Sequence, residues 1–176
     1  MHPVRAASFV HTAAVPLAAV PGWPSVPEGV VLDRVVGVAV DSRGRIYFSH
    51  RGDRPLWRLH PDGRFEREIG GDLMRKTTAY DLRGPTPKPI ATKCWMHGLH
   101  VDADDNLYCT DDGDHTVRKV TPEGKVLLTI GVPDRPAPFL SGRPFNRCTH
   151  TALSPAGEIY VSDGYGNSCV HKYSPD

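Results

Sequence analysis

Three polar residues of this 176-residue chain could act together on one substrate: Arg51, His97 and Tyr165. A guanidinium can clamp a carboxylate through two parallel hydrogen bonds. An imidazole is a common zinc ligand. A tyrosine hydroxyl can serve as an acid or a base when a metal ion lies beside it. The three residues lie far apart in the sequence, so this chemistry depends on elements that bring them together.

Those elements are three stretches written to one template. Each stretch has an apolar strand, a turn, a second strand, a polar turn, and a third strand that ends near a proline. Repeated units of short strands are typical of a β-propeller, so we expect an all-β fold with almost no helix. The second strands of the three stretches are centred on Ile46-Tyr47, Leu107-Tyr108 and Ile159-Tyr160.

The template divides the chain into a lead-in and one domain. Residues 1–30 form a Pro-rich lead-in, and residues 31–176 form the propeller domain. Its blades span about 35–71, 95–131 and 148–176, and the last one is incomplete. The segments 72–94 and 132–147 are insertions, which we expect on the binding face.

Three blades are too few to close a ring, because propellers close with about four to eight. We therefore expect about half of a ring, with two open sheet edges that favour self-association and poor solubility. The chain would then be a piece of a longer protein or one partner of an oligomer that completes the ring. In either case we expect the half-ring alone to be inactive.

The template also predicts where the three polar residues lie. The first strand of a blade lines the central channel, so His97, at the start of that strand in the second blade, should point toward the axis. Arg51 and Tyr165 lie in the matching polar turns of the first and third blades. Structural roles remain open for all three. Arg51 could pair with Asp53 or Asp81, His97 could bond a strand end, and Tyr165 could pack over the next blade.

Taken together, the turns resemble a known family. The segments HRGD at 50–53, HGL at 97–99 and SDGYGNS at 162–168 resemble peptidyl-α-hydroxyglycine α-amidating lyases and their bacterial relatives, which are NHL-repeat propellers. The resemblance implies a six-bladed ring with a central zinc held by three His and a calcium on the axis. It implies cleavage of a peptidyl-α-hydroxyglycine, or a related α-hydroxy amide, to a peptide amide and glyoxylate.

The resemblance also implies a role for individual residues. His97 would be a zinc ligand, and the main-chain carbonyls of Val38 and Leu99 would face the calcium. Arg51 would bind the substrate carboxylate, and Tyr165 would be the catalytic base.

Some positions depart from the family pattern. The other two zinc His would lie in blades that this sequence does not contain. Asn146 and Gly166 stand where the animal enzymes have a disulfide, and His150 replaces an acidic residue. The alternative function is therefore a non-catalytic NHL propeller that binds a protein or a small ligand on its loop face.

Composition narrows the partners. The net charge of +1 argues against nucleic acid, although a local patch of Arg75, Lys76 and Arg83 leaves RNA binding as a third hypothesis. No apolar run is long enough to span a membrane. The N-terminus is a weak signal-peptide candidate, so a cytoplasmic location is favoured and secretion remains open.

The cysteines give no recognisable metal motif. The four residues contain no CxxC pair, which excludes a zinc ribbon or a thioredoxin-like motif. Reduced thiols are favoured, with Cys109 and Cys169 behaving as small strand hydrophobes. A Cys148–Cys169 disulfide stays open at this point.

Overall fold

The computed structural model describes residues 18–71, 73, 76–81, 86 and 88–175, which form strands and one short helix. The expectation of almost no helix is confirmed. In chain order the elements are β1 (Val35–Val40), β2 (Ile46–His50), β3 (Leu56–Leu59), β4 (Phe65–Glu68), β5 (Thr77–Asp81), β6 (Lys88–Lys93), β7 (Met96–Val101), β8 (Leu107–Asp111), β9 (Thr116–Val120), β10 (Val126–Ile130), β11 (His150–Leu153), β12 (Ile159–Asp163), α1 (Gly164–Asn167) and β13 (Cys169–Tyr173).

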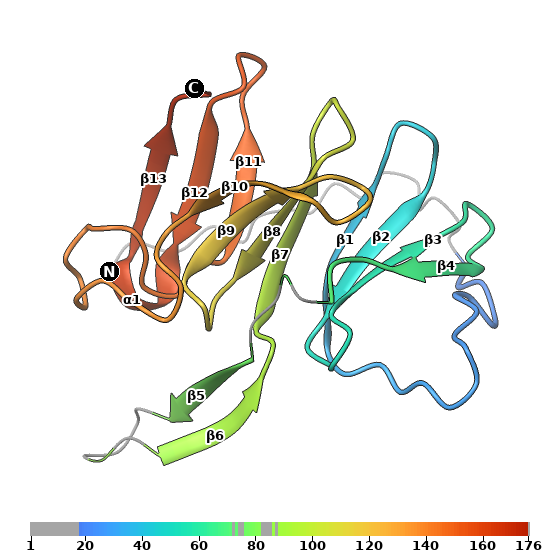
Figure 1. Ribbon diagram of the computed structural model, residues 1–176, viewed down its shortest axis with the longest axis horizontal. Coiled ribbons are helices and arrows are strands. Elements are labelled where there is room, and N and C mark those ends of the chain that lie inside the picture. Colours follow the sequence, from blue (N-terminus) through green and yellow to red (C-terminus); the bar gives the residue numbers. More distant parts are fainter. Residues whose placement is uncertain (1–17, 72, 74–75, 82–85, 87, 176) are drawn as a thin grey trace, which may run out of the picture.

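Three antiparallel sheets follow one another along the chain, and we call them blades 1, 2 and 3 (Figure 1). Blade 1 contains β1 to β4, blade 2 contains β7 to β10, and blade 3 contains β11 to β13. Within each blade, strands that are neighbours in sequence are paired. The fold is a partial all-β propeller, as the sequence predicts.

A single side chain holds the turn between the first two strands of each blade. Oδ1 of Asp41 accepts the backbone N–H groups of Arg43 and Arg45 at 3.0 and 2.9 Å. Asp102 holds the matching turn of blade 2 in the same way, and the Ser154 hydroxyl accepts one bond in blade 3. The template keeps a short polar residue here because the turn's N–H groups need an acceptor.

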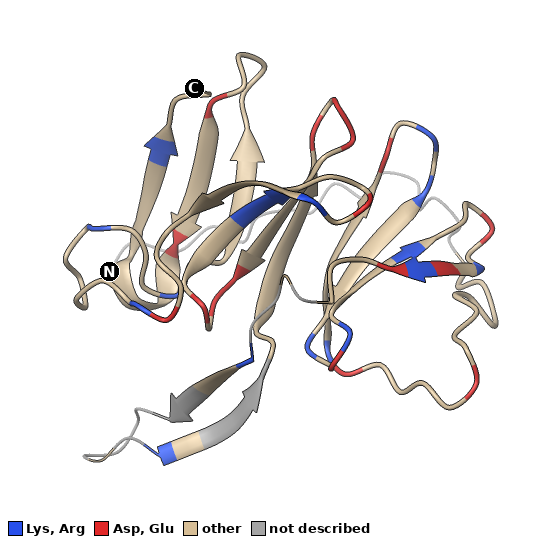
Figure 2. Ribbon diagram, in the orientation of Figure 1, with Lys and Arg blue, Asp and Glu red and all other residues tan. Residues whose placement is uncertain are grey.

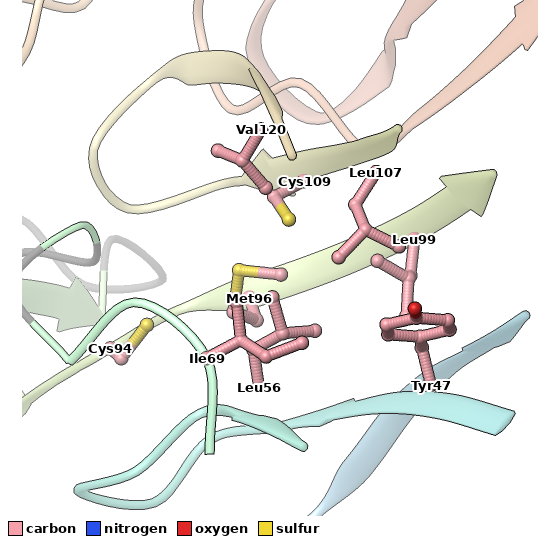
Figure 3. Close-up of a cluster of buried hydrophobic side chains, with 9 residues drawn as sticks. All are labelled: Tyr47, Leu56, Ile69, Cys94, Met96, Leu99, Leu107, Cys109 and Val120. Atoms are coloured by element: carbon pink, nitrogen blue, oxygen red, sulfur yellow. The ribbon is translucent and has the colours of Figure 1, made fainter. Parts of the chain in front are cut away.

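The blades pack face to face on apolar side chains. One cluster joins blades 1 and 2 (Figure 3), and it contains Tyr47, Leu56, Ile69, Cys94, Met96, Leu99, Leu107, Cys109 and Val120. A second joins blades 2 and 3, and it contains Tyr108, Val117, Phe145, Cys148, Ile159 and Val161. The outer face of blade 1 buries Phe48, Trp57 and Leu59, and Val30 and Leu32 from the segment before β1 pack against them. Burying each large apolar side chain stabilises the fold by about 1.5–3 kcal/mol.

The first strands of the blades approach closely where the channel would be. A Cβ on Gly37 of β1 would lie 2.9 Å from Cβ of Leu99 in β7. A Cβ on Gly98 would lie 2.6 Å from the carbonyl oxygen of Thr149 and 2.7 Å from Nδ1 of His150. All three distances are shorter than a real Cβ atom adopts. Glycine at these two positions therefore lets neighbouring blades meet at their inner strands.

The 72–94 insertion contains a hairpin. Strands β5 and β6 pair with each other and project from the three sheets beside the start of β7 (Figure 1). Arg75 and Arg83 of the basic patch lie outside the described residues, as does the N-terminal part of the lead-in, residues 1–17. Figure 2 shows basic and acidic residues interspersed along the described parts of the sheets. Within the described residues, no helix is long and apolar enough to cross a membrane.

Candidate functional site

The three polar residues of the sequence analysis meet where β7 begins. Arg51 follows the last residue of β2, His97 is the second residue of β7, and Tyr165 lies in α1. The turn that contains Tyr165 is wound into this single helical turn, which ends at Ser168 in the left-handed conformation. Tyr165 is 56% exposed, so its side chain is presented at the surface, as its flanking glycines predict.

His97 links blade 2 to blade 3 through both ring nitrogens. Nδ1 lies 2.9 Å from the carbonyl oxygen of Thr149, and Nε2 lies 3.2 Å from the Tyr165 hydroxyl. Because a carbonyl only accepts, Nδ1 carries the proton, which leaves the Nε2 lone pair directed at the hydroxyl. The Tyr165 ring meets the imidazole edge-on, with the centroids 5.6 Å apart.

A cation lies over the ring of the same tyrosine. The guanidinium carbon of Arg147 is 4.6 Å from the centroid of the Tyr165 ring, a cation–π arrangement. The backbone of Arg147 is left-handed, with φ of 64°, and its N–H donates to Nδ1 of His115 at 3.1 Å. Burial lowers the pKa of His115, which suits its role as a neutral acceptor.

Arg51 and Arg147 share one carboxylate. Oδ2 of Asp112 lies 3.7 Å from Nη2 of Arg51 and 3.1 Å from Nη2 of Arg147, and the Asp112 side chain is only 2% exposed. Nε of Arg51 also donates to the carbonyl of Met96 at 3.1 Å, and its guanidinium carbon lies 5.0 Å from the Trp95 ring centroid. The two guanidiniums carry one positive charge more than the carboxylate neutralises.

The structure decides one of the two alternative partners that the sequence suggests for Arg51. Asp53 pairs instead with Lys76 at 2.6 Å, and the Asp81 side chain lies outside the described residues. Arg51 is therefore a paired arginine, but its partner is Asp112, which the sequence did not indicate. Arg147 was also missed. Its position just before the third template copy could have indicated that Arg147 lies near the polar turns. The sequence does not show that its backbone is left-handed or that its guanidinium lies over Tyr165.

Other residues of the sequence analysis lie around this group. Val38 is 64% exposed and Leu99 is buried at 3%. The calcium role of their carbonyls stays a prediction. His150 faces Gly98 across the inner strands, and burial, with His100 and His97 close by, lowers its pKa.

The two positions that match the animal disulfide are neighbours. Asn146 accepts the N–H of Gly166 at 3.0 Å through its carbonyl oxygen, and a Cβ on Gly166 would meet the Asn146 side chain. All four cysteines are free thiols, so no Cys148–Cys169 disulfide is present.

Comparisons with known proteins agree with this architecture. The family model described as NHL repeat matches residues 145–173, which lie mainly in blade 3. Peptidyl-alpha-hydroxyglycine alpha-amidating lyase 1 of Drosophila melanogaster is 33% identical over 164 residues, which cover 86% of this chain and 29% of the lyase. The same fly's lyase 2 is 30% identical over 176 residues, which cover 91% of this chain and 42% of the lyase. This chain is an NHL-repeat propeller that resembles the amidating lyases.

Among solved structures, one titled a streptogramin B lyase structure superposes on this NHL propeller with a TM-score of 0.52 at 13% identity. The match covers 83% of this chain and 42% of that chain, and it shows the fold alone. The NHL propeller spans less than half the length of the two fly lyases, so the similarity alone does not assign their activity to it.

Among the described residues, the geometry of His97 itself fits that of a zinc ligand. A metal-binding His usually donates its second ring N–H to a carbonyl, and His97 does so with Thr149. Its Nε2 is thus available as a ligand beside the Tyr165 hydroxyl. In the part of the chain that the structure describes, no set of three ligand side chains converges at His97.

Proposed function

We propose that this NHL propeller supplies half of the active site of a lyase that cleaves α-hydroxyglycine derivatives of the type R–CO–NH–CH(OH)–COO⁻. The observation that carries the proposal is the grouping of His97, Tyr165 and Arg51 around the start of β7. His97 would contribute one zinc ligand, and the rest would come from polypeptide that completes the ring. The carbonyls of Val38 and Leu99 would face a calcium ion on the axis.

The cationic residues bind and orient the substrate in this proposal. Arg51 has further N–H groups beyond those that face Met96 and Asp112, and these can bind the substrate carboxylate. Arg147, whose side chain is 40% exposed, offers a second guanidinium on the same side. Asp112 holds both arginines in position. A carboxylate bound here brings the adjacent α-hydroxyl toward Tyr165.

Tyr165 moves the proton. A tyrosine acts as a base only as the phenolate, the form that a zinc ion beside it would favour. The phenolate oxygen would accept the proton of the substrate hydroxyl, the C–N bond would break as the hydroxyl carbon becomes an aldehyde, and the electron pair of the broken bond would go to nitrogen. That nitrogen takes up a proton and leaves as the amide, while the rest leaves as glyoxylate. When bound, zinc supplies a Lewis acid for the hydroxyl oxygen. His97, held by Thr149, would hold the ion beside the tyrosine oxygen, with Nε2 bonded to the ion in place of the hydroxyl.

The test measures glyoxylate release from an N-acyl-α-hydroxyglycine by the protein in its complete-ring form, because the half-ring alone is expected to be inactive. Tyr165→Phe is expected to lower kcat by about 10²–10⁴-fold, the usual contribution of a proton-transfer group. Arg51→Met is expected mainly to raise KM, because it removes carboxylate binding. Tyr160→Phe is the matched control, since the Tyr160 hydroxyl bonds Glu158 in blade 3.

The outcome separates the two functions. Glyoxylate release that Tyr165→Phe abolishes and Tyr160→Phe retains supports the lyase. A complete ring that releases no glyoxylate contradicts the proposal and leaves a non-catalytic binding propeller. Equal release after Tyr165→Phe contradicts the role given to Tyr165.

A further inference from the structure

A second group of ligand side chains lies on the second and third strands of blade 3. Asp163 ends β12, and Cys169 and His171 lie on the paired strand β13. Because Cys169 and His171 are two residues apart on one strand, their side chains share a face. Cys169 pairs directly with Asp163 across the ladder, which brings the carboxylate to the same face.

The ligand atoms of these residues converge on one point. Sγ of Cys169 lies 3.4 Å from Nε2 of His171, and Nε2 lies 3.0 Å from Oδ2 of Asp163. All three atoms lie within 4.8 Å of one another. A single ring nitrogen has one bonding direction, so it cannot satisfy both neighbours fully through one proton. A cation between the three atoms would bond all of them at once.

The spacing suits a small tetrahedral ion. With zinc–ligand distances of about 2.0–2.3 Å, sulfur and nitrogen ligands lie about 3.5 Å apart, and nitrogen and oxygen ligands about 3.4 Å apart. The observed separations differ from these by a few tenths of an ångström. Side-chain shifts of that size are small for residues near a surface, and the His171 side chain is 13% exposed.

The surroundings already hold the ligands in place. The Asp163 carboxylate is fully buried and accepts the backbone N–H of Asn146 at 3.0 Å and the amide of Asn167 at 2.6 Å. The His171 ring meets Phe145 edge-on, with centroids 5.3 Å apart. Outer bonds of this kind orient metal ligands and strengthen binding.

We propose that Asp163, Cys169 and His171 form a binding site for zinc or a similar borderline divalent ion, separate from the zinc proposed at His97. A thiolate and an imidazole favour such ions, whereas Ca²⁺ and Mg²⁺ take oxygen ligands. Binding releases the thiol proton and moves the imidazole proton to Nδ1. Water would take the fourth position.

The site has a direct structural consequence. Asp163 and Cys169 flank α1, which contains Tyr165. A bound ion ties the two ends of that helical turn together and fixes the turn that presents the tyrosine. This consequence does not depend on the lyase proposal, because the ion would bind whether or not Tyr165 reacts.

The test uses Co²⁺ as a probe of the intact protein, because a cobalt–thiolate bond gives a charge-transfer absorption that oxygen and nitrogen ligands do not. We expect this band at one equivalent, its loss in Cys169→Ser, and its displacement by Zn²⁺ but not by Mg²⁺. His97→Gln is the matched control and should keep the band. Loss of an outer-shell partner costs about 10–100-fold in affinity, so loss of the Cys169 ligand should weaken binding by more than about 100-fold.

Two results would overturn the site: no thiolate band in the wild-type protein, or a band that persists in Cys169→Ser. Cys169 is only half-buried and lies near the end of the chain, so Ser is a mild change there. If Cys169→Ser fails to fold, a second measurement on the wild-type protein still tests the site. Bound Zn²⁺ should protect Cys169 from alkylation. Equal alkylation with and without Zn²⁺ contradicts the proposal.

Discussion

Blades 2 and 3 place different chemistry at the same point of one fold. The second strand of each ends on a buried aspartate, Asp111 in blade 2 and Asp163 in blade 3. Asp111 pairs with Thr116 on the next strand, and Asp163 pairs with Cys169. Two residues further along, blade 2 has Arg118 where blade 3 has His171.

The different residues on the third strand change which groups surround the buried aspartate of each blade. In blade 2, Arg118 pairs with Asp114, and Asp111 accepts bonds from the N–H groups of Gly113 and Asp114 and from the Cys94 thiol. In blade 3, His171 and Cys169 both face Asp163. Arginine is always protonated, so it pairs with a carboxylate and cannot bind a metal ion. A neutral imidazole has a lone pair that can bind one. The fold tolerates both because either arrangement gives the buried carboxylates hydrogen-bond donors.

The largest effect is expected from the blade 2 ion pair. Arg118→Met leaves the buried Asp114 carboxylate without its cation, which should lower the free energy of unfolding by about 3–5 kcal/mol. Chemical denaturation measures it. Lys172→Met is the control, because the Lys172–Glu158 pair on blade 3 is exposed to solvent, where an ion pair contributes little to stability. Equal losses in the two variants would mean that Arg118 is not the structural cation of blade 2.

The next effect is a pH dependence that belongs to blade 2. Burial raises the pKa of Asp111 to about 6 from an ordinary 3.8. The folded state therefore holds this proton more tightly, and its contribution to stability is complete below about pH 4 and is lost as the pH rises through 6. We expect the unfolding free energy to fall by up to about 3 kcal/mol across this window. Asp111→Asn, which keeps an acceptor oxygen, should remove this fall of the unfolding free energy between pH 4 and 6. An unchanged dependence on pH would show that Asp111 is not its source.

A slightly smaller effect is expected from zinc on blade 3. An ion that binds only the folded state stabilises it by about 2.7 kcal/mol at a free concentration 100 times its Kd. Thermal unfolding with Zn²⁺ should show that gain in the wild-type protein and in Asp111→Asn, but not in Cys169→Ser. A gain that disappears with Asp111 and survives without Cys169 would place the metal in blade 2 instead.

The sequence predicts the strands well because the template repeats the local rules. Asp41 and Asp102 recur where a turn needs an acceptor, and Gly37 and Gly98 recur where inner strands meet. The grouping of His97 with Tyr165 also follows from the template, since the start of a blade's first strand and the turn after its second strand lie at the same end of the blade.

The remaining contacts depend on features that no template position encodes. Arg147 reaches Asp112 and Tyr165 from the 132–147 connection, where a left-handed backbone sets its direction. The strand pattern predicts that Cys169 behaves as a small hydrophobe, but it is only half-buried and faces His171. Its spacing of two residues from His171 was a usable signal, but the third ligand required the register of β12 against β13.

The central claim is that blade 3 holds a metal-binding group where blade 2 holds only structural contacts. Anomalous diffraction at the zinc absorption edge, from crystals of the protein grown with Zn²⁺, tests it most directly. We predict a peak bounded by Cys169 Sγ, His171 Nε2 and Asp163 Oδ2, and none between Asp111 and Cys94. A map with no peak among the three blade 3 residues would contradict the account.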